Sequence, residues 1–157
     1  MQLFYLLYCL IYFTIADTKS LPQIPFDIIN SGTGVWDDCG KNETTIHSQS
    51  VALTPFPPFR GQDLEILWNG STDSLIDETY TANISIQLGA VILFNQPKIL
   101  CEEIGRWDLQ CPLRKGNYEI KERLGVPISA PPGHYRLRVL ITTENVTAGC
   151  LNIQFQL

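Results

Sequence analysis

The chain is poor in charge. Only 17% of its 157 residues are Asp, Glu, Lys or Arg, and 45% are hydrophobic. This composition argues against a disordered chain and against a coiled coil, because both need many more charged residues. The net charge is −5 and there is no run of Lys or Arg, so a nucleic-acid partner, which requires a basic face, is not expected. The length fits one domain.

Beyond its first residues the chain also lacks a long apolar run. No later stretch approaches the ~18 consecutive apolar residues of a membrane-spanning helix. The segment 3–16 is uncharged and apolar except for Thr14, which is typical of a signal peptide, although an uncleaved N-terminal anchor is an alternative. We therefore expect a signal peptide (1–16), an N-terminal arm (17–34) and one domain (35–157).

Cysteine pairs with metal-binding spacing are absent as well. The sequence contains no C-x-x-C pair, so neither zinc nor any other metal site is predicted. Removal of the leader removes Cys9 and leaves an even number of cysteines, which favours disulfides formed in an oxidising compartment. Three connectivities are open to the four that remain. These are Cys39, Cys101, Cys111 and Cys150.

Four N-glycosylation sequons follow the predicted signal peptide. Single sequons arise by chance, but four in one chain indicate luminal or extracellular exposure. Each asparagine that is used must face solvent. The acceptor residues are Asn42, Asn69, Asn83 and Asn145.

Catalytic motifs are missing too. Only His47 and His134 could act as bases near neutral pH without a large pKa shift, and neither lies in a G-x-S-x-G or H-E-x-x-H motif. The acidic pairs at 37–38 and 102–103 are interpreted as solvated surface charge, because adjacent residues on a strand point to opposite faces. We predict no catalytic residue, no enzyme activity and no cofactor.

Period-two alternation of apolar and polar residues dominates the rest of the chain, which is typical of half-buried strands. Strands are predicted over 83–94, 134–141 and 151–157, with shorter runs at 51–54 and 64–68. Turn signals separate them, including the prolines from Pro55 to Pro58, the pair Asn69-Gly70 and the tripeptide Pro131-Pro132-Gly133. A helical turn is expected only near Cys101. The pattern predicts an all-β antiparallel β-sandwich.

The contexts of the cysteines carry a family resemblance. They are, in order, Trp36-Asp37-Asp38-Cys39-Gly40, then Cys101, then Cys111-Pro112-Leu113-Arg114-Lys115-Gly116-Asn117-Tyr118, then Pro131-Pro132-Gly133-His134-Tyr135 and Gly149-Cys150-Leu151. This order resembles the ML lipid-recognition family. Its members include the soluble Niemann–Pick type C sterol carrier and fungal phosphatidylglycerol/phosphatidylinositol transfer proteins. The combination is most similar to the phospholipid-transfer branch.

The resemblance implies an immunoglobulin-like sandwich whose two sheets enclose an apolar cavity for a lipid, so residues 35–157 would form an ML-type lipid-binding domain. It implies disulfides Cys39–Cys150 and Cys101–Cys111. Plain core packing is the alternative role for the cavity-wall residues. The expected lipid-contacting residues are Ile84, Ile86, Leu88, Ile92 and Phe94 from one strand, Leu137, Val139, Ile141, Ile153 and Phe155 from others, and Val126 and Ile128 at the pocket mouth.

The expected function is binding and transfer of a sterol or phospholipid between membranes, by a monomer that is secreted or resides in the endosomal, lysosomal or vacuolar lumen. Contact with membranes or with a membrane lipid transporter would be transient, and the bound lipid is the only ligand expected. Arg114, Lys115 and Lys121 could meet an anionic headgroup, with ordinary solvation as the alternative. A lipid-presenting partner of a cell-surface receptor is the competing function.

Overall fold

The structure, a computed structural model, describes residues 35–40 and 43–157. The predicted signal peptide, the N-terminal arm and Asn42 lie outside these residues. Within them, no helix is long and apolar enough to cross a membrane. The strands are β1 (Val35–Asp38), β2 (Ile46–Thr54), β3 (Asp63–Thr72), β4 (Thr81–Leu88), β5 (Val91–Ile99), β6 (Gly116–Gly125), β7 (His134–Thr143) and β8 (Val146–Gln156), and the helical segments are α2 (Leu100–Ile104) and η3 (Gly105–Trp107).

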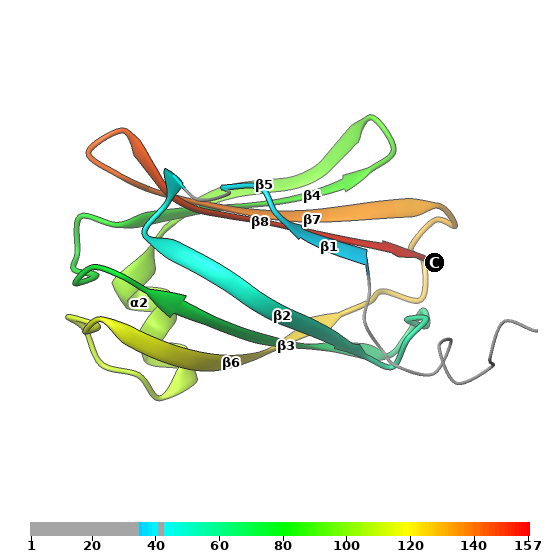
Figure 1. The fold of residues 1–157 in the computed structure, drawn as a ribbon. Coiled ribbons are helices and arrows are strands. Elements are labelled where there is room, and N and C mark those ends of the chain that lie inside the picture. Colours follow the sequence, from blue (N-terminus) through cyan, green and yellow to red (C-terminus); the bar gives the residue numbers. More distant parts are fainter. Residues whose placement is uncertain (1–34, 41–42) are drawn as a thin grey trace, which may run out of the picture. The chain divides into compact units, whose positions relative to one another are not determined.

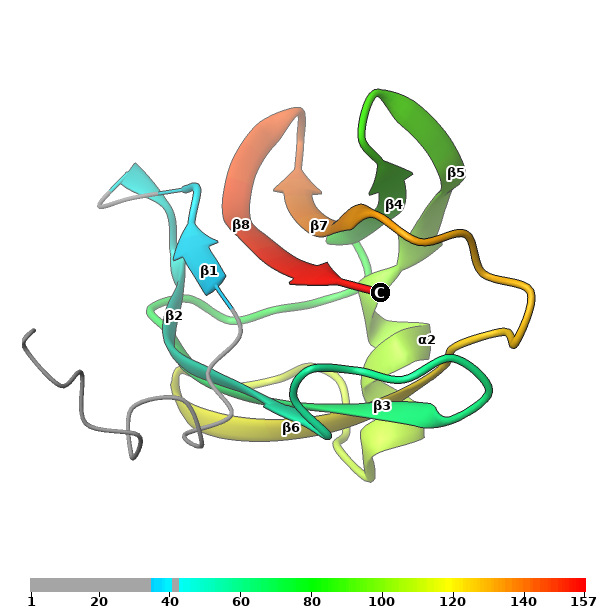
Figure 2. The same cartoon turned by 90° about the vertical axis from the view of Figure 1, so that its right-hand side faces the viewer.

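The strands form two antiparallel sheets that face each other (Figure 1). The larger sheet has the order β1-β8-β7-β4-β5, and the smaller has the order β2-β3-β6. The helical segments α2 and η3 connect β5 of the larger sheet to β6 of the smaller one, beside the strands at one side of the sandwich (Figure 2). This architecture confirms the predicted all-β sandwich.

Two hydrophobic clusters fill the two ends of the sandwich. The first joins the end of β2 to the start of β7 and includes Leu53, Leu64 and Phe155, whose ring stacks on Tyr135 with centroids 5.6 Å apart. The second surrounds α2 and includes Ile104 and residues from the starts of β2, β4 and β8. Trp68 packs against both clusters, so they meet between the two sheets.

The predicted strand over 83–94 is wrong, because the chain reverses in its middle. Leu88 pairs with Val91, so Gly89 and Ala90 form a two-residue turn between β4 and β5. Gly89 has a φ of +57°, which suits the first position of such a hairpin turn. The helical turn near Cys101 is confirmed as α2.

The predicted turn at Asn69-Gly70 is also wrong, since both residues lie inside β3. A Cβ at Gly70 would collide with the Trp68 ring and the His47 carbonyl. Glycine is therefore needed here because the indole packs directly against the backbone, and not because the chain turns. Strands β1 and β6 were not predicted.

Candidate functional site

A cavity of about 530 Å³ lies between the two sheets. Its volume falls within the range of roughly 300–1,000 Å³ that is typical of small-molecule sites. Both sheets contribute its walls. The apolar side chains lining it are Ile46, Ile66, Trp68, Ile76, Ala82, Ile84, Ile86, Phe94, Leu100, Ile104, Trp107, Leu113, Tyr118, Ile120, Leu124, Leu137, Val139, Ile141, Leu151 and Ile153.

One edge of the sandwich, where β1 and β2 lie, is tied shut. The disulfide Cys39–Cys150 joins the residue after β1 to β8. The Ser48 amide of β2 donates to the Asp38 carboxylate at 2.9 Å, and the Thr45 amide donates to the Ala148 carbonyl at 3.0 Å. The two hydrogen bonds cross from one sheet to the other, whereas the disulfide lies within the larger sheet and anchors the end of β1 to β8. The sheets are therefore held together along this edge, called the closed edge below.

The opposite edge, between β5 and β6, is called the open edge below. Both strands are the last of their sheets, so neither has a hydrogen-bonded neighbour on its outer side. The cavity reaches the surface here, because the exposed residues Phe94, Gln96 and Arg106 are among those that line it. A ligand can therefore enter between β5 and β6 without breaking a sheet.

A charged cluster lies at the open edge beside α2. Arg106 Nη1 donates to Glu103 Oε2 at 2.6 Å, and Arg106 Nη2 lies 3.9 Å from Glu122 Oε1. Trp107 Nε1 donates to the other Glu122 oxygen at 2.6 Å. The hydrogen bond and charge of Glu103, together with the charge of Glu122, raise the pKa of Arg106 above its ordinary value. Arg106 is therefore shared by two carboxylates, and the cluster has one negative charge more than it has positive charges.

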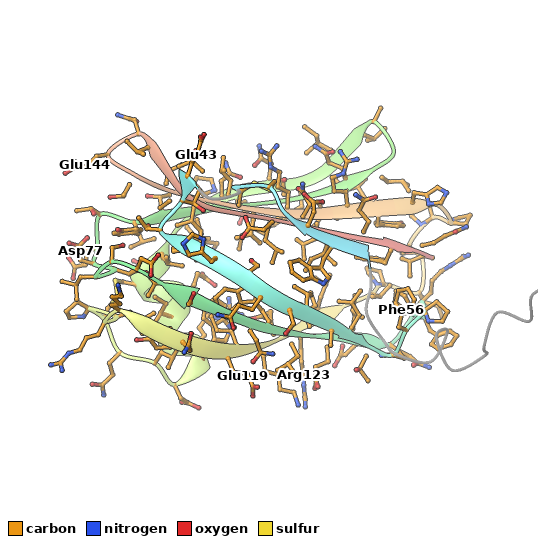
Figure 3. The ribbon with its side chains drawn as sticks, viewed as in Figure 1. Glu43, Phe56, Asp77, Glu119, Arg123 and Glu144 are labelled. Carbon is orange, nitrogen blue, oxygen red and sulfur yellow. A yellow bond between two sulfur atoms is a disulfide. The ribbon has the colours of Figure 1, made fainter. Side chains whose placement is uncertain are left out.

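Lys98 differs from these groups. It lines the cavity from β5, is half-buried and has no ion-pair partner within 4.0 Å among the described residues. Besides Arg106, the cavity is bordered by the basic residue Arg123, which points away from it on the outer face of the smaller sheet (Figure 3), where its Nε lies 3.6 Å from Glu65. Lys98 thus supplies a positive charge to a mainly apolar cavity with no protein counter-ion.

Seven of the twelve predicted lipid-contacting residues line the cavity. They come from β4, β5, β7 and β8, and the structure brings them together between the sheets. They are Ile84, Ile86, Phe94, Leu137, Val139, Ile141 and Ile153.

The structure places the other five outside the lining. Ile92 faces outward because the two-residue turn sets it opposite Gln87, an outward-facing residue, and the bulge at Leu93 then returns Phe94 to the inner face opposite Ile86. Leu88, Val126 and Phe155 pack in the end cluster that includes Tyr135. Ile128 is 81% exposed in the β6–β7 loop.

Strand β6 contributes to the cavity although the sequence pattern did not predict it. Its inward-facing residues Tyr118, Ile120, Glu122 and Leu124 all line the cavity. They alternate with exposed polar residues, so the period-two signal was present but was interrupted by Glu122. The three basic residues proposed for a headgroup do not line the cavity: Arg114 is exposed, Lys115 lies near Asp73 and Lys121 pairs with Glu65.

The acidic pairs are less solvated than predicted. Glu103 is buried and paired with Arg106, and Asp38 accepts hydrogen bonds from the Gly40 and Ser48 amides. Their interpretation as solvated surface charge is wrong for these two residues. The two histidines lie apart: His47 Nε2 is 3.1 Å from Asp73, and His134 is exposed at the start of β7.

The two predicted disulfides, Cys39–Cys150 and Cys101–Cys111, are both present in the structure. The described sequon asparagines differ in exposure. Asn145 is exposed in the β7–β8 turn, whereas Asn69 and Asn83 are half-buried on β3 and β4. Among the described residues, Asn145 therefore best meets the requirement that a glycosylated asparagine face solvent.

The fold and cavity together define an antiparallel β-sandwich that is closed along one edge and open to an apolar interior along the other. The sequence profile of the ML domain matches residues 34–157. The chain belongs to the ML domain family.

Individual relatives agree with this assignment. A phosphatidylglycerol/phosphatidylinositol transfer protein of Mycosarcoma maydis is 29% identical over 126 residues, which cover 77% of this chain and 64% of that protein. The protein of the same name from Candida albicans is 37% identical over 57% of this chain and 47% of its own length. A Dictyostelium discoideum protein, named as a candidate for the same transfer, is 30% identical over 81% of this chain and 89% of its own length.

A solved structure has the same fold. A Niemann-Pick type C2 protein from the Japanese carpenter ant superposes with a TM-score of 0.59 over 78% of this chain and 98% of that one, at 15% identity. The alignments with the first two fungal relatives leave a third to a half of those proteins uncovered, so what they do as whole proteins is not carried over to this chain directly.

Proposed function

We propose that this chain binds a phospholipid by its acyl chains in the cavity between the sheets and carries it between membranes. The observation that carries the proposal is the apolar cavity open between β5 and β6. Each methylene group that leaves water for such a cavity contributes about 0.8 kcal/mol, so binding needs no reaction and little directional bonding. A binding role rather than a catalytic one follows from this arrangement.

The names of the relatives and the position of Lys98 support an anionic headgroup. Phosphatidylglycerol and phosphatidylinositol each carry a negatively charged phosphodiester. A phosphate placed near Lys98 would give this half-buried cation a counter-ion, and a charge-assisted hydrogen bond contributes about 1.5–3 kcal/mol. The acyl chains would then extend from Lys98 past Ile84 and Ile86 into the apolar interior.

The two disulfides and the family support a secreted or luminal protein, because disulfides persist in oxidising compartments. A transient membrane contact and a monomeric carrier complete the proposal.

Native mass spectrometry of the full chain tests the proposal. After incubation with vesicles, we expect one phospholipid per chain, and vesicle-to-vesicle transfer of a fluorescent phospholipid should follow. A chain that takes up no lipid would contradict the proposal. Uptake of sterol but not of phospholipid would assign a sterol carrier instead, and uptake without transfer would favour lipid presentation to a receptor.

The Lys98→Met variant tests the headgroup assignment. It keeps the length and apolar stem of the side chain but removes the charge, so we expect the preference for phosphatidylglycerol over phosphatidylcholine to fall by about tenfold or more. Arg114→Met is the matched control, because Arg114 is exposed and does not line the cavity. An unchanged preference in Lys98→Met would overturn the role of Lys98.

A further inference from the structure

Three segments meet at one end of the sandwich: the β2–β3 loop (residues 55–62), the β4–β5 turn with the start of β5 (89–93), and the β6–β7 loop (126–133). Backbone hydrogen bonds connect them. The Gly61 amide donates to the Val126 carbonyl at 2.8 Å, and the Gly89 amide donates to the His134 carbonyl at 3.1 Å. We call these three segments together the apolar end. Figure 1 shows them at the same end of the molecule.

Large hydrophobic side chains are exposed on all three segments of the apolar end. Ile128 is 81% exposed, Val91 is 61% exposed and Phe59 is 52% exposed. Phe56, Ile92 and Leu93 are exposed beside them. Elsewhere in the described chain, exposed large hydrophobic residues are scattered singly, as at Leu75 and Val146. A gathered exposed set of this kind marks an interaction surface.

The charge of the apolar end distinguishes it from the rest of an acidic chain. The three segments contain no carboxylate, and their only charged residue is Arg60. The opposite end carries Glu43, Asp77 and Glu144, and Figure 3 shows these three far from Phe56. The opposite end is mixed in charge, since Lys115 pairs with Asp73 there, whereas the apolar end has no carboxylate to repel an anionic surface.

The apolar end is also continuous with the cavity. Phe94 follows Leu93 on β5, is 37% exposed and lines the cavity at the open edge. An acyl chain that leaves the cavity past Phe94 would meet Val91, Ile92 and Leu93 next, without crossing a charged side chain of those segments. This continuity favours a lipid surface as the occupant over a second copy or a protein.

We propose that the apolar end is the surface by which this protein docks on a lipid bilayer, with its exposed residues in the headgroup region and the open edge presented to the membrane. The inference rests on the proposed transfer function, since a carrier must meet the membrane to exchange its lipid. The binding strength of such a surface scales with the apolar area it buries and with its attraction to anionic lipids.

The test is co-sedimentation of the full chain with vesicles of equal parts phosphatidylcholine and phosphatidylglycerol. The test variant Phe59→Ser/Val91→Ser/Ile128→Ser removes one apolar side chain from each segment. Because burying one such side chain is equivalent to about tenfold in affinity, we expect vesicle binding to fall by at least about 100-fold. The matched control Leu75→Ser/Val146→Ser removes exposed apolar residues outside the apolar end and should bind as the parent chain does.

Lipid retention, measured by native mass spectrometry, separates docking from the cavity. The triple variant should still hold lipid while its vesicle binding and transfer rate fall. Equal vesicle binding by the triple variant and the parent, or an equal loss in the control, would overturn the docking surface. If the parent chain does not bind vesicles but forms a dimer, and the triple variant is monomeric, the apolar end is instead the contact surface for a second copy of the chain. A parent chain that holds no lipid would overturn the transfer function separately.

Discussion

The two edges of the sandwich differ in how the two sheets are connected. At the closed edge, hydrogen bonds from the Thr45 and Ser48 amides cross between the sheets, and the disulfide Cys39–Cys150 anchors the end of β1 to β8 within the larger sheet. At the open edge, the charged groups around Arg106 pair mainly with one another, and the space between β5 and β6 leads into the cavity. Because the two sheets are connected along the closed edge, they can remain separated at the open edge without loss of the fold.

The largest expected effect on the free energy of unfolding comes from removing the disulfide at the closed edge. Cys39→Ala/Cys150→Ala opens a loop with a sequence separation of 111, and the chain-entropy model assigns about 4–5 kcal/mol to such a cross-link. Cys101→Ala/Cys111→Ala opens a separation of 10 and should cost roughly 2.5–3 kcal/mol. Urea unfolding of both variants measures the difference. Equal losses would show that the closed edge does not depend on its disulfide.

The next comparison sets a core residue of the closed edge against a wall residue of the open edge. Leu53 on β2 is 1% exposed, so Leu53→Ala should lower the free energy of unfolding by about 2–5 kcal/mol. Phe94 on β5 is partly exposed at the cavity mouth, so Phe94→Ala should cost only about 0.5 kcal/mol, in the range of surface substitutions, while it weakens lipid binding. Thermal unfolding and lipid titration of each variant measure the two effects. A Phe94→Ala protein as unstable as Leu53→Ala would mean that Phe94 is core.

A third substitution tests whether the cavity between the sheets is needed for lipid binding. Val139→Phe adds volume on β7 where the residue lines the cavity, so we expect little change in stability and a clear loss of bound lipid. Leu64→Phe makes a smaller addition to a fully buried residue of the end cluster and should nevertheless cost about 1–3 kcal/mol through overpacking. Native mass spectrometry together with urea unfolding separates the two outcomes. Equal destabilisation would place Val139 in a packed core.

The strands with a clean two-faced pattern could be predicted from the sequence, because each has one face in the interior and one in water. The even-numbered positions stay apolar through Ala90, Ile92 and Phe94, so the pattern alone does not reveal the hairpin, although the two-residue turn exchanges the faces of odd and even positions and the bulge at Leu93 exchanges them back. The turn that faces Ile92 outward and the bulge that returns Phe94 inward depend on the pairing of β4 with β5, and such register is not encoded in one strand.

The cavity wall from β4, β7 and β8 was predicted in part, whereas the polar members of the site were not. Lys98 and Glu122 occupy inward positions that a core residue would normally fill, so a rule that places apolar residues inside passes over them. Glu103 of α2 is buried and pairs with Arg106 of η3, three residues later, a pairing that depends on this segment being helical. Positions that break local rules in this way are expected where function is located.

The smallest effect concerns the outer face of the smaller sheet, beside the open edge. Glu65 accepts a hydrogen bond from Lys121 at 2.8 Å and lies near Arg123, and these neighbours lower the pKa of Glu65 below its ordinary 4.5. A carboxylate whose pKa is lowered by folding stabilises the native state above its ordinary pKa, and this contribution is lost as the pH falls toward the lowered value. The free energy of unfolding of the parent should therefore exceed that of Glu65→Gln slightly at neutral pH, and the difference should shrink below pH 4.5. High salt should also reduce it, because exposed pairs are screened. If the difference in the free energy of unfolding between the parent and Glu65→Gln persists at low pH and at high salt, Glu65 acts through packing. The smaller sheet would then be stabilised by more than screened surface charge.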